Sequence, residues 1–325
     1  MPALPAWLLV HFAGAAMGTW WARRYALKGN LMDHPGERRS HAAPTPRGGG
    51  IAIVAMVLLA GIAVGAQNAE DRWLLWSFVP GLMIVAGIGW WDDHRPLSPW
   101  LRLGVQAIAA TLLASGVWSA TDTLCYAIFA FVAAMVLVNV WNFMDGINGL
   151  AASQASLAAL AYAALMPASG AVTWIAWALF AACAGFLPFN FPRARIFMGD
   201  VGSGALGYTL AMLVAMSVVA APLDSVPLTF LPLCAFLVDA SFTLAWRMLR
   251  GERWWTPHVS HLYQWAARRW GHSCVTVIYL VFGSVSLLLS FTLPNTTRGT
   301  GAAVVAGSYA AAGALWFLLR RGWRD

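Results

Sequence analysis

Long apolar runs separated by short polar stretches recur along the whole chain, and this pattern predicts helices that cross a membrane. A helix needs about 20 mostly apolar residues to span a bilayer. Eleven segments meet this requirement, at approximately 3–21, 48–66, 73–91, 102–118, 122–140, 147–166, 170–187, 204–221, 226–246, 274–293 and 301–319. We therefore expect an all-α, polytopic integral membrane protein with a single domain over residues 1–325.

The basic residues give this chain a direction in the membrane. All but Arg72 and Arg298 of the 20 Lys and Arg residues fall in every second loop or in the C-terminal tail. Because basic loops stay in the cytoplasm, we expect a periplasmic N-terminus and a cytoplasmic C-terminus. The cytoplasmic loops are then about 22–47, 91–102, 139–147, 188–203 and 247–273. Basic residues follow the first segment instead of preceding it, so this helix is expected to be retained and not cleaved as a signal.

Composition agrees with a membrane protein and argues against other classes. Hydrophobic residues make up 60% of the 325 and charged residues only 10%, which is unlike a soluble domain. The net charge of +7 follows from the topology and needs no nucleic acid partner. The four cysteines are scattered without a CxxC pair, so neither a disulfide framework nor a zinc ribbon is indicated.

Acidic and imidazole side chains collect on the predicted cytoplasmic side, whereas the opposite loops are short and bland. Asp92 and Asp93 lie in GWWDDHRP, Asp145 in NFMDG and Asp200 in IFMGDVGSG. The histidines on this side include His41, His94, His258 and His261. Helix ends alone would place similar groups on both faces. The asymmetry therefore predicts a functional site at the cytoplasmic surface.

Each acidic motif has a structural and a functional interpretation. Asp92 and Asp93 are either a solvated pair or a partly buried pair that needs a divalent cation or acts as a base. Asp200 either caps the next helix or binds magnesium beside a glycine-lined phosphate cradle at that helix N-terminus. Asp239 lies inside a predicted span, where an isolated carboxylate is costly, so it should have a partner that the sequence does not identify.

Three polar side chains follow the fifth apolar segment at three-residue spacing. Asn139, Asn142 and Asp145 can share one helix face, which would leave an unsatisfied polar stripe unless something binds there. Amides and a carboxylate offer directional hydrogen bonds to a base or a sugar. We interpret the stripe as facing a water-filled cleft at the inner leaflet, where a charged nucleotide meets a lipid.

Two further stretches have the composition of phosphate-binding sites. In TPRGGG, the glycines either permit close helix packing or let the amides of Gly48 and Gly49 approach a phosphate beside Arg47. The stretch lacks the Lys-Ser/Thr ending of a P-loop. His258 and His261 are spaced i, i+3, so they would share a face of a helix. Without an HExxH motif they suit phosphate recognition or acid/base chemistry better than a zinc site.

These stretches, taken in order, resemble the polyprenyl-phosphate N-acetylhexosamine-1-phosphate transferases of glycosyltransferase family 4. Six motifs carry the resemblance over most of the chain: RRSHAAPTPRGGG, WWDDHRP, NVWNFMDGINGL, NFPRARIFMGDVGSG, PLCAFLVDASFTLAWR and TPHVSHLYQ. The resemblance implies a bacterial inner-membrane enzyme with its active site facing the cytoplasm. It would use Mg²⁺, or alternatively Mn²⁺, to transfer a sugar 1-phosphate from a UDP-N-acetyl sugar to undecaprenyl phosphate and release UMP. Membrane lipid is a further partner, and a homodimer is one option for the assembly.

The resemblance also assigns roles to residues. Asp200 would hold Mg²⁺ with Asp92 as a second ligand. The residues implied in catalysis and in handling the two phosphates are Asp92, Asp93, Asp145, His258 and His261. Those implied in nucleotide-sugar binding are Asn139, Asn142, Asp145, Asn190, Phe197, Arg47, Gly48 and Gly49, with Phe197 stacked near the uracil. Direct attack by the lipid phosphate is favoured, and a covalent aspartyl-phosphate stays open.

Two motifs favour one branch of the family. HVSHLYQ and APTPRGGG depart from the His-rich triplet and GTPTMGG of the branch that transfers phospho-MurNAc-pentapeptide. This favours the branch that initiates O-antigen, lipopolysaccharide or other surface polysaccharides, with GlcNAc, GalNAc, FucNAc or QuiNAc as the sugar. The peptidoglycan enzyme is one alternative.

Two other classes fit less well. A transporter of a charged solute would have sites near the membrane midplane and internal repeats. Here the acidic residues cluster at one face, with Asp239 as the exception. A CDP-alcohol phosphotransferase would show a DG…AR…G…D…D pattern, which is absent.

Overall fold

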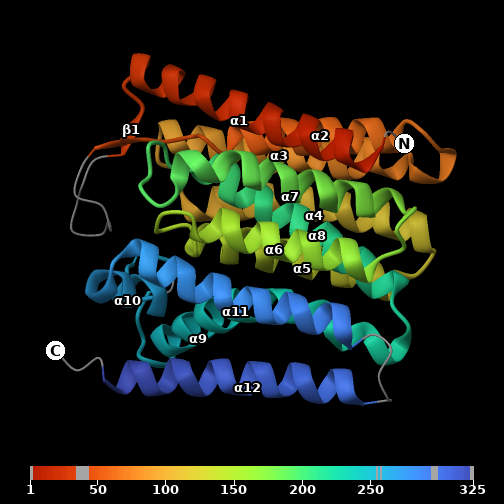
Figure 1. Cartoon of the computed structure of the whole chain (residues 1–325). Helices are drawn as coiled ribbons and strands as arrows, with labels where there is room; N and C mark the ends of the chain where they lie inside the picture. The colour runs from red at the N-terminus through yellow and green to blue at the C-terminus, as the bar shows by residue number, and fades with distance from the viewer. Residues whose placement is uncertain (1–2, 34–43, 254, 257, 294–298, 323–325) are drawn as a thin grey trace.

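The computed structural model describes residues 3–33, 44–253, 255–256, 258–293 and 299–322. Within these residues the helices lie side by side as a bundle, with one antiparallel pair of short strands, β1 (Met32–Asp33) and β2 (Thr45–Pro46) (Figure 1). The α-helices are α1 Leu4–Lys28, α2 Ile51–Gly65, α3 Val79–His94, α4 Pro99–Thr121, α5 Leu124–Phe143, α6 Leu150–Leu165, α7 Ala171–Asn190, α8 Asp200–Ala220, α9 Cys234–Leu249, α10 Leu262–Trp270, α11 His272–Thr292 and α12 Thr300–Arg321. The all-helical prediction is confirmed.

Each of the eleven apolar segments coincides with a helix, and eight helices of the described residues are long and apolar enough to cross a membrane. The eight are Ala69–His94, Pro99–Thr121, Leu124–Phe143, Ala171–Asn190, Asp200–Ala220, Leu223–Leu249, His272–Thr292 and Thr300–Arg321. Two of them begin irregularly, with a 3-10 turn (η1, Ala69–Asp71) and a π turn (η2, Leu74–Phe78) before α3, and with a 3-10 stretch (η3, Leu223–Leu233) before α9. α2 and α6 are shorter apolar helices. The number of crossings, eleven, stays a prediction.

One helix was not expected. α10 lies inside the predicted loop 247–273 and has only nine residues, too few to appear as a membrane span. It buries Tyr263, Gln264, Ala266 and Ala267 and carries Arg268 and Arg269 in its last turn. Basic residues at a helix C-terminus interact favourably with the helix dipole. α10 is therefore a short amphipathic helix beside the membrane helices.

α8 forms the buried centre of the bundle and packs against α3, α5 and α6. A Cβ atom on Gly207 would lie 2.2 Å from the carbonyl oxygen of Leu137, so α5 can approach this closely only because residue 207 is glycine. The start of α8 is consequently held in a fixed position relative to the end of α5.

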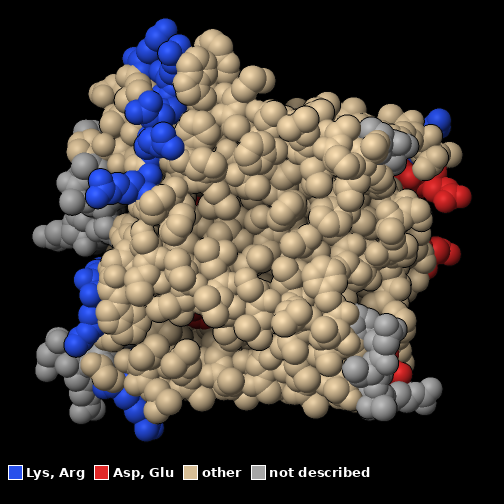
Figure 2. Space-filling view, in the orientation of Figure 1, with Lys and Arg blue, Asp and Glu red and all other residues tan. Residues whose placement is uncertain are grey.

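The ends of α3, α5 and α9 and the starts of α4, α8 and α10 meet at one end of the bundle. Lys and Arg side chains gather along this end, Asp and Glu side chains show at the opposite end, and most of the surface between them carries no charge (Figure 2). α1 begins at the opposite end, and α12 finishes at the Lys- and Arg-rich end (Figure 1). The acidic and histidine motifs are thus brought to the basic end, as the loop pattern predicts.

Candidate active site

Asp93, near the end of α3, is buried and binds the first turn of α8. Its Oδ1 accepts a hydrogen bond from the amide of Asp200 at 3.0 Å, and its Oδ2 accepts one from the amide of Val201 at 3.1 Å. The Nε of Arg47 lies 4.0 Å from Oδ1. Both carboxylate oxygens are therefore occupied, and a carboxylate at this position stabilises a helix N-terminus. This geometry gives Asp93 a structural role at the start of α8, and the catalytic role stays a prediction.

The phosphate cradle predicted at the start of α8 is not formed. The amides of Asp200 and Val201 donate to Asp93, and those of Gly202 and Ser203 both donate to the carbonyl of Gly199 at 3.0 Å. The cap of α8 comes from Asp93, while Asp200 is the first residue of the helix and not its cap. The side chain of Asp200 is therefore free to face the site.

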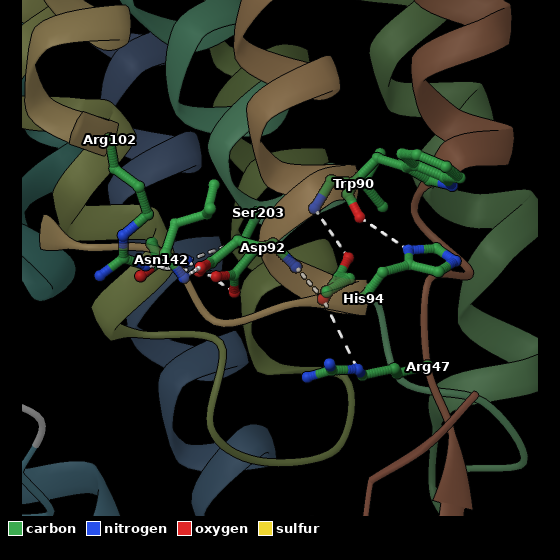
Figure 3. A network of polar contacts seen from close by, with 11 residues as sticks. Arg47, Trp90, Asp92, His94, Arg102, Asn142 and Ser203 are labelled. Atoms are coloured by element: carbon green, nitrogen blue, oxygen red, sulfur yellow. Dashed lines mark hydrogen bonds and ion pairs between the residues drawn. The ribbon is translucent and has the colours of Figure 1, made fainter. Parts of the chain in front are cut away.

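Asp92 points away from Asp93 although the two are adjacent, because successive residues of a helix are rotated by about 100°. Its Oδ1 accepts from the amide of Leu97 at 2.6 Å, and its Oδ2 accepts from Nη1 of Arg102 at 2.8 Å. The same nitrogen lies 3.4 Å from Oδ2 of Asp200. Arg102 thus bridges the two carboxylates that the sequence assigned to the metal (Figure 3).

The amide of Asn142 completes this group. Its Nδ2 donates to Oδ1 of Asp200 at 2.9 Å and lies 3.2 Å from Oγ of Ser203 (Figure 3). Asn139, one turn earlier on α5, donates to Oε1 of Gln106 at 2.9 Å and to the carbonyl of Met135 at 2.8 Å. Asn142 therefore orients Asp200, whereas Asn139 joins α5 to α4.

Asp145 completes the predicted stripe, but α5 ends at Phe143 and Asp145 follows in the loop. The expectation of one helix face is therefore wrong for the third residue. The structure shows no side-chain hydrogen bond or ion pair for Asp145 among the described residues. Burial, together with the nearby carboxylates of Asp200 and Asp93, holds the pKa of Asp145 well above its usual range. A cation or a hydrogen-bond donor brought by a ligand would stabilise its charged form.

Asp145 lines a cavity of about 310 Å³ that lies between the acidic residues and the histidines. The remaining lining residues come from five places, namely the start of α4, the end of α5, the loop after α5, the loop before α10 and α10 itself. They include Arg102, Asn139, Asn142, Phe143, Gly146, Trp255, Thr256, His258, His261, Tyr263 and Gln264. The cavity brings together residues that are far apart in the sequence and that the motifs placed on one side of the membrane.

His258 and His261 both line this cavity and lie next to each other, with ring centroids 4.8 Å apart. They are not on one helix face, because α10 begins only at Leu262 and His261 is its N-cap. Burial, with the nearby charges of His261, Arg247 and Arg320, lowers the pKa of His258 to about 3. Burial also lowers the pKa of His261, and the carboxylate of Asp239 opposes this shift. Both imidazoles are therefore neutral near neutral pH until an anion arrives.

Asp239 has the partners that its intramembrane position requires. Its buried carboxylate accepts from the amides of Leu262 and Tyr263, at 2.9 and 3.1 Å, and from the hydroxyls of Tyr279 and Thr243, at 3.0 and 3.2 Å. It is thus fully hydrogen-bonded at the start of α10, which is the paired role expected from the sequence.

The triple-glycine stretch uses its amides within the protein. Gly49 donates to the carbonyl of Phe197 and Gly50 to that of Met198, both at 2.9 Å. Arg47 and Gly48 line a second cavity, of about 450 Å³, with Trp21, Tyr25, Trp90 and His94. Arg47 and His94 lie on the far side of the network from Arg102 (Figure 3). The amides of Gly49 and Gly50 are therefore engaged within the protein, and the assignment of Arg47, Gly48 and Gly49 to the nucleotide sugar stays a prediction.

Two other predicted binding residues have structural partners. Asn190 is buried, donates from Nδ2 to the carbonyl of Ile196 at 2.9 Å and accepts from the amide of Gly149 at 2.6 Å. It ties two loops together, and its assignment to the nucleotide sugar stays a prediction. Phe197 is half-buried and pairs through its backbone with Pro46 and Gly49. His41 lies outside the described residues.

The sequence did not single out Arg102, Ser203 or Tyr263. Arg102 was counted only as a loop charge, although a basic residue four positions into an apolar helix is a signal of a partner. Ser203 follows Asp200 by three residues on α8, so it lies on the same face of the helix. The hydroxyl of Tyr263 donates to the carbonyl of Phe143 at 2.8 Å and joins α10 to α5, a link that no sequence pattern reveals.

The site has the oxygen ligands that Mg²⁺ prefers. Asp200 is the most exposed of the carboxylates around Arg102, and the guanidinium between Asp92 and Asp200 shows that this point attracts a cation. Among the described residues no three His, Cys, Asp or Glu side chains lie close enough to hold a metal ion by themselves. Mg²⁺ commonly binds through one or two carboxylates, water and substrate phosphates. The residues therefore fit an ion that a diphosphate helps to hold.

Known proteins resemble this chain over most of its length. The sequence profile described as "Glycosyl transferase family 4" matches residues 75–218, which include Asp92, Asp145 and Asp200. A decaprenyl-phosphate N-acetylglucosaminephosphotransferase of Mycobacterium tuberculosis is 30% identical, over 98% of this chain and 89% of that protein. A probable undecaprenyl-phosphate N-acetylglucosaminyl 1-phosphate transferase of Bacillus subtilis is 28% identical, over 85% and 80%.

A third relative comes from the peptidoglycan branch. A phospho-N-acetylmuramoyl-pentapeptide-transferase of Lactiplantibacillus plantarum is 28% identical over 51% of this chain and 60% of that protein. The similarity to the N-acetylglucosamine transferases therefore covers much more of the chain than the similarity to this enzyme.

Proposed function

Because the chain belongs to glycosyl transferase family 4, we propose that it transfers an N-acetylhexosamine 1-phosphate from a UDP-sugar to undecaprenyl phosphate. One observation carries the proposal. A cavity at the basic end of an apolar bundle is lined by Asp145, by Arg102, whose guanidinium contacts Asp200, and by the His258–His261 pair. Such a cavity suits a diphosphate that must meet a lipid phosphate at the membrane surface.

In the proposed reaction an oxygen of the lipid phosphate attacks the phosphorus attached to the sugar. A new P–O bond forms, the P–O bond to the uridine-bearing phosphate breaks, and UMP leaves with that electron pair. The lipid phosphate is already ionised near neutral pH, so direct attack needs no strong base. Two anions must approach each other, so the main barrier is electrostatic.

The chain's own residues would reduce this barrier by orienting charge. Arg102 and Asn142 fix the carboxylate of Asp200, and Asp92 holds Arg102 in place. His258 and His261 are neutral donors in the free protein that can hydrogen-bond the diphosphate. Mg²⁺, bound through Asp200 and the substrate phosphates, would neutralise the diphosphate and polarise the leaving group.

The membrane arrangement is part of the proposal. Eleven crossings with a periplasmic N-terminus would place the cavity at the cytoplasmic face of the bacterial inner membrane. The gathering of Lys and Arg at the cavity end of the bundle supports this orientation, as does the position of the start of α1 and the end of α12 at opposite ends.

N-acetylglucosamine is the first donor to test, because it is the sugar in the names of the relatives matched over most of the chain. An initiating step of O-antigen or another surface polysaccharide would use such a product, whereas the peptidoglycan reaction is the alternative. Asp239 was the feature that favoured a transporter, and its four in-chain donors leave it no free oxygen pair for a transported ion.

The test is UMP release by the purified protein with undecaprenyl phosphate, Mg²⁺ and each of UDP-GlcNAc, UDP-GalNAc, UDP-FucNAc and UDP-QuiNAc. We expect UMP from one donor, a lipid-linked sugar diphosphate as co-product, and loss of both on adding EDTA. Decaprenyl phosphate and UDP-MurNAc-pentapeptide are the matched comparisons for acceptor and donor. Release of UDP in place of UMP would overturn the proposal, because the sugar would then have been transferred without its phosphate.

A further inference from the structure

The carboxylate of Asp239 joins three helices at the edge of the candidate site. It belongs to α9, caps the first two amides of α10 and accepts the hydroxyl of Tyr279 on α11. All of these donors surround a side chain that is 2% exposed. A buried carboxylate with this many donors has one stable orientation, so the start of α10 is fixed relative to α9 and α11.

The start of α10 carries one of the two imidazoles that line the cavity. His261 is the N-cap of α10, and its backbone amide donates to Oε1 of Gln264 at 3.2 Å. Its Nδ1 is buried without a hydrogen-bond partner and lies 3.9 Å from Oδ1 of Asp239. Asp239 thus contacts the His261 ring and the backbone of the two residues that follow it, Leu262 and Tyr263.

The position of the other imidazole, His258, also depends on the start of α10. Nδ1 of His258 lies 2.9 Å from Oγ of Ser260, and the carbonyl of Ser260 accepts from Nη1 of Arg320 at 3.1 Å. Oγ of Ser260 also lies 3.5 Å from Nη1 of Arg247. The residue that follows Ser260 is His261, so a shift of the start of α10 would move both rings.

We propose that Asp239 is a positioning residue, which acts through the start of α10 to place His261 and His258 against the substrate diphosphate. Asp239 does not contact the substrate and is not itself catalytic. This inference rests on the proposed function for its kinetic test, because that function gives the two histidines their ligand. It assigns a role in the site to a carboxylate that lies inside the apolar part of the bundle.

The first test is a double-mutant cycle between Asp239→Asn and His261→Gln in the full-length protein. In Asp239→Asn an NH₂ group replaces one carboxylate oxygen. One of the two hydrogen bonds from the backbone amides of α10 is then lost, and the NH₂ group lies against that amide N–H. We expect kcat per folded protein to fall about 100-fold, as displacement of about 1 Å in a catalytic group can cause. In the His261→Gln background the same change should cost less than about twofold, because the group that Asp239 positions is already gone.

A milder pair of variants covers the case in which Asp239→Asn does not fold. Tyr279→Phe removes one donor from Asp239 and leaves both backbone caps, so a loss of about threefold in kcat is expected. Tyr162→Phe is the matched control, since its buried hydroxyl donates to the carbonyl of Thr229 at 3.0 Å, away from α10. Tyr162→Phe should leave the kinetic constants unchanged, and the effect of Tyr279→Phe should vanish in the His261→Gln background.

A proteolysis measurement tests the positioning without any turnover. Release of the start of α10 should expose the preceding loop, so trypsin should cut after Arg253 at least about fivefold faster in Asp239→Asn than in the wild type. Full activity in Asp239→Asn would overturn the proposal, as would losses that multiply independently in the double variant. If the wild type releases no UMP from any donor, the proposed function fails, and the trypsin rates alone then decide whether Asp239 holds this segment.

Discussion

The starts of α8 and α10 are built in the same way on opposite sides of one cavity. In each case an aspartate from an apolar helix accepts the first two backbone amides of the helix, Asp93 for α8 and Asp239 for α10. In each case the residue expected to act on the substrate lies at the helix start that the aspartate caps. This residue is Asp200 in α8 and His261 before α10. Both halves of the site therefore use buried charge to aim a reactive group.

The two starts differ in how tightly the surroundings hold them. A Cβ on Gly199 would lie 2.5 Å from Oδ2 of Asp93, and a Cβ on Gly202 would lie 2.6 Å from Cα of Gly50. The start of α8 is thus confined on one side by the side chain of Asp93 and on another by the backbone of Gly50. The loop before α10 instead contains Gly251, around which no atom lies within 4 Å of a Cβ. We infer that the acidic half is preset by packing, while the histidine half is held mainly by hydrogen bonds and charge.

The largest effect is expected from removing the negative charge of Asp200, in the acidic half of the site. Asp200→Asn keeps the size and the hydrogen bond from Asn142 but loses the negative charge, so UMP release should fall about 100- to 1,000-fold. Ser203→Ala is the control, because it removes only the weaker 3.2 Å contact of Asn142 and should change the rate less than about threefold. A folded Asp200→Asn protein that keeps more than a tenth of the activity would contradict the assignment.

The second prediction tests the difference in packing directly. Gly199 and Gly251 both have positive φ, +78° and +71°, so alanine is strained at either position by about 1–3 kcal/mol. Only Gly199→Ala also pushes against Asp93, so it should lower activity at least about tenfold and lower Tm more than Gly251→Ala does. Activity and thermal unfolding of both variants provide the measurement. Equal losses would show that backbone strain alone decides, and that the packing difference is unimportant.

Asp145, between the two halves, should limit stability as the pH rises. Because its pKa is raised, the folded protein retains a proton that the unfolded chain has lost between the ordinary and the raised pKa, and stability falls as pH rises through that window. In EDTA, Asp145→Asn should therefore raise Tm by a few degrees near pH 8, with a smaller difference near pH 4. A pH-independent difference, or a lower Tm near pH 8, would contradict the raised pKa of Asp145.

The smallest effect is expected on the histidine half, at His258. Since its pKa is lowered to about 3, His258 is neutral in the free protein across the neutral range. His258→Gln should lower kcat/KM by about three- to tenfold at every pH from about 5 to 8 and leave the shape of the profile unchanged. Disappearance of an acidic limb in the variant would mean that His258 titrates there, and that its burial is relieved in the working enzyme.

The sequence predicted the helices more successfully than the partners within the site. Apolar runs determine where helices form, and the distribution of basic residues indicates which helix ends lie at the same end of the bundle. Both signals depend only on local composition. Asp93 and Asp200 are 107 positions apart, and their contact depends on which helix ends meet. The adjacent pair Asp92–Asp93 was interpreted as one unit, although the rotation of about 100° between helical neighbours sends the two carboxylates to different partners.

Asn190 shows a second limit of pattern reading. An Asn next to a phosphate-type motif looks like a ligand contact, yet its amide joins two loops through Gly149 and Ile196. The same residue type serves both purposes, and only the positions of the neighbouring backbone groups decide between them. Asp239 is the opposite case, because its cost inside a span correctly predicted a partner that only the folded chain identifies.

The partners of Asp239 also have a consequence for how the protein is made. Leu262, Tyr263 and Tyr279 all follow Asp239 in the chain, so a ribosome synthesises α9 before the groups that satisfy its carboxylate. A carboxylate at the centre of an inserting helix costs about 2.5–3.5 kcal/mol. α9 should therefore settle in the bilayer only together with α10 and α11, so that these three helices form one unit of membrane insertion.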